Sequence, residues 1–126
     1  MANNYERQVM TLANFGVDQL VNAGVEGGVP VGDNVLSFEV PAGKVVTGVI
    51  LRNMKNDLAS SGAATVAVKL GTTSVASATA ISAIKGTAVY FPIADGEVMT
   101  ESTPITLTVA VAPLTAGNLD IVVMYI

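Results

Sequence analysis

Residues 119–126, LDIVVMYI, limit the possible folds of this chain more than any other segment. The run is rich in β-branched and aromatic residues, and Asp120 is its only charged residue, so it predicts a β-strand. Its apolar side chains occupy both alternating rows: Leu119, Ile121, Val123 and Tyr125 in one, and Val122, Met124 and Ile126 in the other. We expect one row to enter the core and the other to meet a second layer or a neighbouring subunit.

No polar tail follows this run in the sequence. Terminal residues fray unless a sheet or a core holds them. We therefore expect the strand to be paired and largely buried, and we expect removal of residues 123–126 to abolish folding or assembly.

The composition is that of a single domain with unusually little charge. Hydrophobic residues make up 51% of the 126 residues and charged residues 13%, against about a quarter in an average soluble domain. The mean hydropathy is +0.58. No apolar run approaches the roughly 20 residues that span a bilayer, so we expect no membrane partner. The excess of hydrophobic residues indicates a dense β core or, as we favour, a surface buried in an assembly.

Short β-prone runs alternate with turn signals through most of the chain. This spacing is typical of an antiparallel β-sandwich or barrel, and we predict an all-β sandwich of about seven or eight strands. Residues 35–126 are expected to form its body, and residues 1–34 an N-terminal strand or arm with a glycine-rich loop. The expected strands of the body are residues 36–40, 45–53, 65–70, 74–78, 87–92, 105–111 and 119–126.

The first third permits two interpretations. Apolar residues from Val9 to Val21 fall at helical spacing, with Asn4 and Gly24 placed as caps. Gly16 interrupts that pattern, and several neighbours are β-prone. We favour a strand over residues 6–13 followed by an irregular segment, and a helix is the alternative.

The residue types exclude the commonest catalytic and metal sites. The chain has no His and no Cys, so it lacks the usual general base, thiolate nucleophile and zinc ligands. Asp95 and Glu97 flank Gly96 in a predicted turn, where we expect solvated side chains; a calcium ion held by Asp95 is the alternative. The six basic residues are scattered singly, so we expect no nucleic-acid binding. We assign no catalytic, cofactor or metal-binding residue and predict a non-enzymatic protein.

A partner surface is the remaining kind of site. Tyr residues are common in cores and as interface anchors, and they also form sugar-stacking platforms. We favour the core or interface role. The candidate interface residues are Tyr5, Val9, Phe15, Tyr90, Met124 and Tyr125.

Three segments in this order carry a family resemblance: residues 38–49 (FEVPAGKVVTGV), 66–71 (VAVKLG) and 113–126 (PLTAGNLDIVVMYI). They resemble small β-sandwich virion proteins of tailed bacteriophages, of the capsid decoration, or cement, type. The resemblance covers residues 35–126.

The resemblance implies a jelly-roll-like sandwich that binds and stabilises a phage capsid and catalyses no reaction. It implies a major capsid protein as partner, a homotrimer as the favoured assembly, and no cofactor. The expected location is the capsid surface of the virion, after synthesis in the host cytoplasm, and residues 1–30 would be available as a capsid-binding arm. The alternative is another virion or surface component, such as a head-fibre, tail or glycan-binding module.

Overall fold

The computed structural model describes residues 6–10, 16–24 and 27–126, and these residues are predominantly β. They form eleven strands and one helical turn. The elements are β1 (Glu6–Met10), β2 (Gly16–Asn22), β3 (Gly32–Val40), β4 (Val45–Arg52), β5 (Ala59–Ser60), β6 (Thr65–Leu70), β7 (Thr73–Ala80), α1 (Ile81–Ile84), β8 (Ala88–Val98), β9 (Thr103–Ala110), β10 (Leu114–Ala116) and β11 (Asn118–Tyr125).

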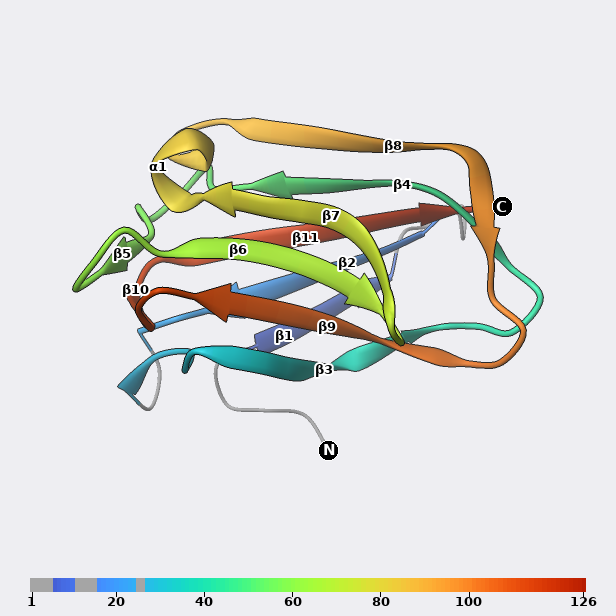
Figure 1. Ribbon diagram of the computed structural model, residues 1–126, viewed down its shortest axis with the longest axis horizontal. Helices are drawn as coiled ribbons and strands as arrows, with labels where there is room; N and C mark the ends of the chain where they lie inside the picture. The colour runs from blue at the N-terminus through green and yellow to red at the C-terminus, as the bar shows by residue number, and fades with distance from the viewer. Residues whose placement is uncertain (1–5, 11–15, 25–26) are drawn as a thin grey trace.

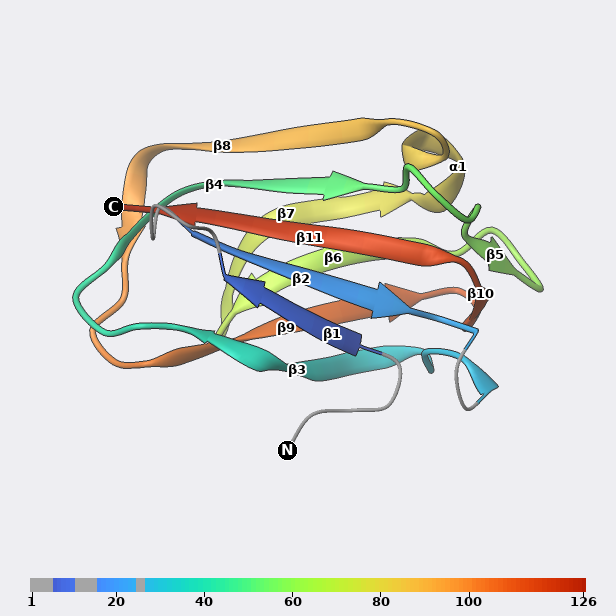
Figure 2. The ribbon, with the colours of Figure 1, turned by 180° about the vertical axis from the view of Figure 1, so that it is seen from behind.

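Two antiparallel sheets pack face to face (Figures 1 and 2), which confirms the predicted all-β sandwich. The five-stranded sheet has the order β1-β2-β11-β4-β8, and the four-stranded sheet has the order β3-β9-β6-β7. The short strands β5 and β10 pair at one end of the sandwich. Side chains from the inner faces of both sheets form one core, which includes Leu36, Val49, Leu51, Leu107, Ile121 and Val123.

The strand pairs are nested around the β6–β7 hairpin. β6 pairs with β7, β4 with β8, β3 with β9, and β2 with β11, all antiparallel. Successive pairs alternate between the two sheets: β6–β7 and β3–β9 lie in the four-stranded sheet, and β4–β8 and β2–β11 lie in the five-stranded sheet. This arrangement brings β11 from one end of the sequence into the middle of the five-stranded sheet, between β2 and β4.

The two rows of β11 have different surroundings. Leu119, Ile121, Val123 and Tyr125 are at most 2% exposed and enter the core. Val122 and Met124 are half-buried on the outer face of the sheet. The backbone of Ile126 exchanges two hydrogen bonds with Val45, so pairing extends past β11. The expectation of a paired and largely buried strand is confirmed.

The N-terminal third is β in the parts that the structure describes. β1 agrees with the strand favoured over residues 6–13, whereas the irregular segment predicted after it is wrong for residues 16–22, which form β2. A Cβ on Gly16 would collide with the carbonyl oxygen of Val123, so glycine permits the close approach of β2 to β11. The residue that weakened the strand pattern in the sequence is thus required by the neighbouring strand.

Gln19 is a buried polar residue that joins the two sheets. It is 0% exposed and lies on the inner face of β2. Its Nε2 donates to Ser37 Oγ at 3.3 Å, and its Oε1 accepts from the Phe38 N–H at 3.2 Å. The β3–β9 register is interrupted between Val35 and Glu39, so Gln19 satisfies a backbone group that the ladder leaves unpaired.

Two further local predictions need correction. Asp95 and Gly96 do not form a turn between strands, since β8 continues through them with an irregularity opposite Thr47. Gly96 has φ +74°, and a side chain there would collide with Val45. Glycine is therefore the residue that fits the β-bulge at this position. The strand expected over residues 74–78 is longer, and α1 follows it directly.

Val111 stores backbone strain that substitution should release. It has φ +77° in the turn between β9 and β10, a conformation that β-branched residues rarely adopt, and its side chain is 71% exposed. We expect Val111→Gly to raise the melting temperature by about 4 °C, because strain of about 1 kcal/mol is removed and little buried surface is lost. Thermal unfolding followed by circular dichroism measures the change.

Val31→Gly is the matched control. Val31 is also exposed, at 54%, but it is not among the residues with positive φ. Glycine there should lower the melting temperature, because it adds only freedom to the unfolded chain. Equal decreases in both variants would contradict the assignment of strain to Val111.

Candidate functional site

The outer face of the five-stranded sheet carries an apolar strip. Strand register places Val122 opposite Ile50, and Ile50 opposite Tyr90, so these three side chains follow one line across β11, β4 and β8. Met124 lies two residues further along β11. We call Ile50, Tyr90, Val122 and Met124 the apolar strip. Tyr90 is 54% exposed, and the other three side chains are half-buried.

Gly48 brings two members of the apolar strip together. A Cβ built on Gly48 would lie 2.6 Å from Tyr90 Cε1 and 3.1 Å from Met124 Cε. The Tyr90 ring therefore lies across the bare backbone of β4, with the Met124 methyl beside it. An aromatic ring held flat on a sheet loses little entropy on binding, which favours its use as an interface anchor.

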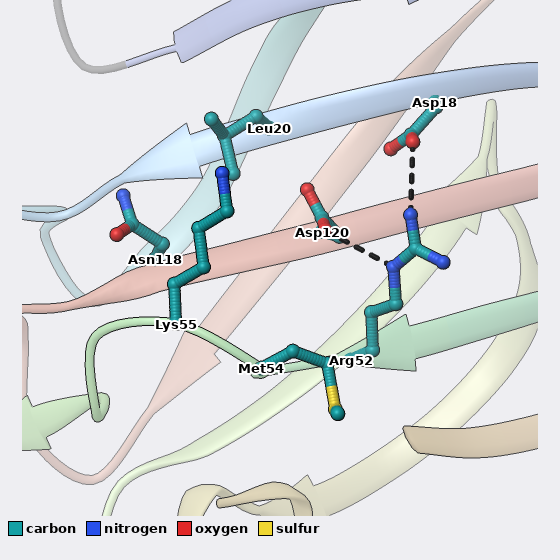
Figure 3. A pocket seen from close by; sticks show the side chains of 7 residues that line it. All are labelled: Asp18, Leu20, Arg52, Met54, Lys55, Asn118 and Asp120. Carbon is teal, nitrogen blue, oxygen red and sulfur yellow. Dashed lines mark hydrogen bonds and ion pairs between the residues drawn. The ribbon is translucent and has the colours of Figure 1, made fainter. Parts of the chain in front are cut away.

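A polar concavity of about 230 Å³ adjoins the apolar strip on the same face (Figure 3). Arg52 on β4 is held between two carboxylates on neighbouring strands. Its Nε donates to Asp120 Oδ2 at 3.0 Å, and its Nη2 donates to Asp18 Oδ2 at 3.1 Å. The Arg52 side chain is 39% exposed and each aspartate 26%, so the guanidinium is fixed in place while part of it faces solvent.

Four further side chains complete the concavity: Leu20, Met54, Lys55 and Asn118. In Figure 3 the two ion pairs lie at one side of the opening, and Lys55 and Asn118 lie at the other. The Asn118 Oδ1 accepts from Asn56 Nδ2 at 2.6 Å. Within the part of the chain that the structure describes, Lys55 Nζ has no hydrogen-bond or ion-pair partner.

The outer face of the four-stranded sheet carries a polar cluster around Asp33. On the four-stranded sheet, Thr108 Oγ1 donates to Asp33 Oδ1 at 2.7 Å, and Lys69 Nζ lies 3.4 Å from Asp33 Oδ2. The hydrogen bond from Thr108, followed by the hydrogen bond and charge of Lys69, lowers the pKa of the Asp33 carboxyl below its ordinary value of 3.8.

Asp33 should make a small, pH-dependent contribution to stability. Because its folded-state pKa is lowered, the contribution is present above the unfolded-state pKa and is lost as the pH falls below about 4. We expect Asp33→Asn to lower the melting temperature slightly at pH 7 and to have no effect at pH 2. Thermal scans of both proteins measure the difference, with Glu101→Gln, an exposed carboxylate, as the control. A difference that persists at pH 2 would contradict the carboxylate as its source.

The structure brings two of the six predicted interface residues together. Tyr90 and Met124 meet over Gly48 in the apolar strip. Tyr125 is 2% exposed, so its prediction as an interface residue is corrected: the ring belongs to the core, with Lys44 Nζ 5.8 Å from its centroid. Val9 lies in β1, where its backbone is opposite Asp18. Tyr5 and Phe15 lie outside the described residues.

The candidate interface residues predicted from the sequence did not include Ile50, Val122 or Arg52, although Val122 belongs to a row of β11 that was expected to meet either the core or a neighbour. The signal for Ile50 and Val122 was present, since residues 45–53 and 119–126 are apolar on both alternating rows. The register that places them side by side is set by tertiary pairing. Nothing in the sequence placed Arg52 between Asp18 and Asp120, which are 34 and 68 residues away from it.

Among the described residues, no three acidic side chains converge on a point where they would hold a metal ion. No helix within residues 6–10, 16–24 and 27–126 has the length and apolar character needed to cross a bilayer.

Fold and surface together define an antiparallel β-sandwich with an apolar strip on the outer face of the five-stranded sheet and a polar concavity beside it. Neither protein-family models, nor curated proteins, nor solved structures that were compared with the chain give a match.

Proposed function

We propose that this protein is a non-enzymatic virion structural protein that binds and stabilises the capsid of a tailed bacteriophage from outside, as a decoration protein. The observation that carries the proposal is the apolar strip on the outer face of the five-stranded sheet. Exposed apolar surface that is contiguous and preorganised marks interaction sites. The absence of His and Cys from the whole sequence supports binding over catalysis.

The strand order supports the virion assignment at the level of fold. Nested pairing of β2 with β11, β3 with β9, β4 with β8 and β6 with β7 distributes eight strands over two sheets, which supports the proposed jelly-roll-like arrangement. Jelly rolls form many viral capsid proteins, although lectins and other domains share the architecture. The resemblance of residues 35–126 to phage decoration proteins points to the same class.

Binding by the apolar strip has a simple energetic basis. A ligand that binds only the assembled shell stabilises that shell by mass action. Tyr90 is the expected centre of the contact, because it combines large apolar area with a polar hydroxyl and is already held in place. The neighbouring side chains of Ile50, Val122 and Met124 extend the apolar surface from which water would be excluded on binding.

Sedimentation with phage shells tests the proposal. Shells of the major capsid protein, prepared without this chain, are mixed with the purified protein and pelleted. We expect saturable binding and greater resistance of the shells to heating. Tyr90→Glu should weaken binding about thirtyfold, the equivalent of a hot spot of about 2 kcal/mol.

The control places the same charge on the other sheet. Val35→Glu changes an exposed apolar residue, 58% exposed, on the four-stranded sheet and should bind like the unchanged protein. Failure of the unchanged protein to bind, or equal losses in both variants, would overturn the proposal. Light scattering of the same samples measures the assembly, which we propose is a trimer of the 12.8 kDa chain.

A further inference from the structure

We propose that the concavity lined by Asp18, Arg52, Lys55, Asn118 and Asp120 is a binding site for a neutral, hydroxyl-rich ligand, namely one sugar unit at the end of a glycan. The inference concerns a different part of the surface from the apolar strip. It does not depend on the proposed capsid-binding role.

The first argument is the fixed geometry of Arg52. Two carboxylates engage its Nε and Nη2 at 3.0 and 3.1 Å. Its Nη1 group donates to no residue that the structure describes, and the side chain is 39% exposed. The planar guanidinium thus holds Asp18 and Asp120 in place, so a ligand would not have to order these side chains.

The second argument is the mixture of donors and acceptors. Lys55 Nζ is a donor and the Asp120 Oδ1 is an acceptor, and neither has a partner among the described residues. A sugar hydroxyl donates and accepts at once, so adjacent hydroxyls can satisfy both kinds of group. Phosphate is anionic and its oxygens mainly accept hydrogen bonds, so it would match the Asp120 Oδ1 less well.

The third argument is charge. Two carboxylates, Asp18 and Asp120, face two cations, Arg52 and Lys55, so the formal charges of the concavity cancel. Arg52 is already paired with both carboxylates. A strongly anionic ligand would have to compete with those carboxylates, whereas a neutral ligand would not.

The fourth argument is size and lining. About 230 Å³ is less than the roughly 300–1,000 Å³ of pockets that enclose drug-sized ligands, which limits the occupant to a single small unit. Leu20 and Met54 supply apolar surface beside the polar groups, and the Met54 side chain, 62% exposed, is available to cover the C–H face of a sugar ring. The open, half-exposed setting predicts weak binding of each unit, strengthened where many copies are displayed together.

Nuclear magnetic resonance provides the test. The intact, uniformly ¹⁵N-labelled protein is titrated with the methyl glycosides of glucose, galactose, mannose and N-acetylglucosamine, and separately with inorganic phosphate. We expect at least one glycoside to shift the amide signals around the concavity in a saturable manner, and phosphate to leave them unchanged. Lys55→Met, which keeps the apolar stem, should weaken binding about fivefold, or about 1 kcal/mol.

Lys69→Met is the matched control, because it removes the same charge from the opposite sheet face. It should bind the glycoside like the unchanged protein. The assignment is overturned if none of the four glycosides shifts these signals, if phosphate shifts them more strongly, or if Lys55→Met and Lys69→Met behave alike. Each result is independent of whether the protein binds phage shells.

Discussion

Replacing Asn53 by leucine is expected to destabilise the protein by about 3–5 kcal/mol, a large share of the roughly 5–15 kcal/mol that holds a typical domain folded. Asn53 is 1% exposed at the end of β4. Its Nδ2 donates to the carbonyl oxygens of Asn56 at 2.7 Å and Asn118 at 2.5 Å, and its Oδ1 accepts from the Leu58 N–H at 3.1 Å.

Leucine has a similar shape but satisfies none of these three backbone groups. The Asn56 carbonyl oxygen would keep its hydrogen bond from the Asn118 N–H, whereas the other two groups would lose the partner that Asn53 provides, which costs about 1–3 kcal/mol per buried group. Of the hydrogen bonds that the structure describes, the loop 54–58 would keep only the two between Asn56 and Asn118 as its attachment to the start of β11. Urea unfolding followed by circular dichroism measures the change in the free energy of unfolding.

Asn56→Leu is the matched control for this substitution. Asn56 lies in the same loop, is exposed, and uses its side chain only for a hydrogen bond to Asn118 Oδ1. We expect a loss of less than about 1 kcal/mol. Similar losses at positions 53 and 56 would contradict the role of Asn53 as the junction between β4, the loop and β11.

Deleting residues 123–126 is expected to abolish cooperative folding. Val123 and Tyr125 are 0% and 2% exposed, and their loss removes about 2 and 4 kcal/mol of burial. The deletion also removes pairing on both sides, since β11 lies between β2 and β4. The total approaches the stability of the whole domain, so no folded population should remain.

Thermal scans and amide-signal dispersion report the outcome for this deletion. Ile126→Ser serves as the control, because the Ile126 side chain is 70% exposed and its backbone bonds to Val45 are kept. That variant should remain folded with a loss of less than about 1 kcal/mol. A deleted chain that still unfolds in one sharp transition would show that β11 is dispensable.

The fold class was predictable because its cause is local. Alternating apolar residues and turn signals predicted a β-sandwich, and period two separated the rows of β11 correctly. The strand β2 was not predictable, because Gly16 and the helical spacing of its neighbours argued against it. Its close approach to the Val123 carbonyl explains the glycine, and that contact exists only once β11 is in place.

The sequence by itself determined the β character, the apolar excess and the lack of His and Cys chemistry, because these follow from residue types and from spacing within a strand. Tertiary structure alone decided which row of each strand faces the core. Tyr125 and Met124 are neighbours of similar apolar character, yet one is buried and the other reaches the outer face beside Tyr90. It also decided that Asp18, Arg52 and Asp120 meet, because register between distant strands is a property of the packed sheets.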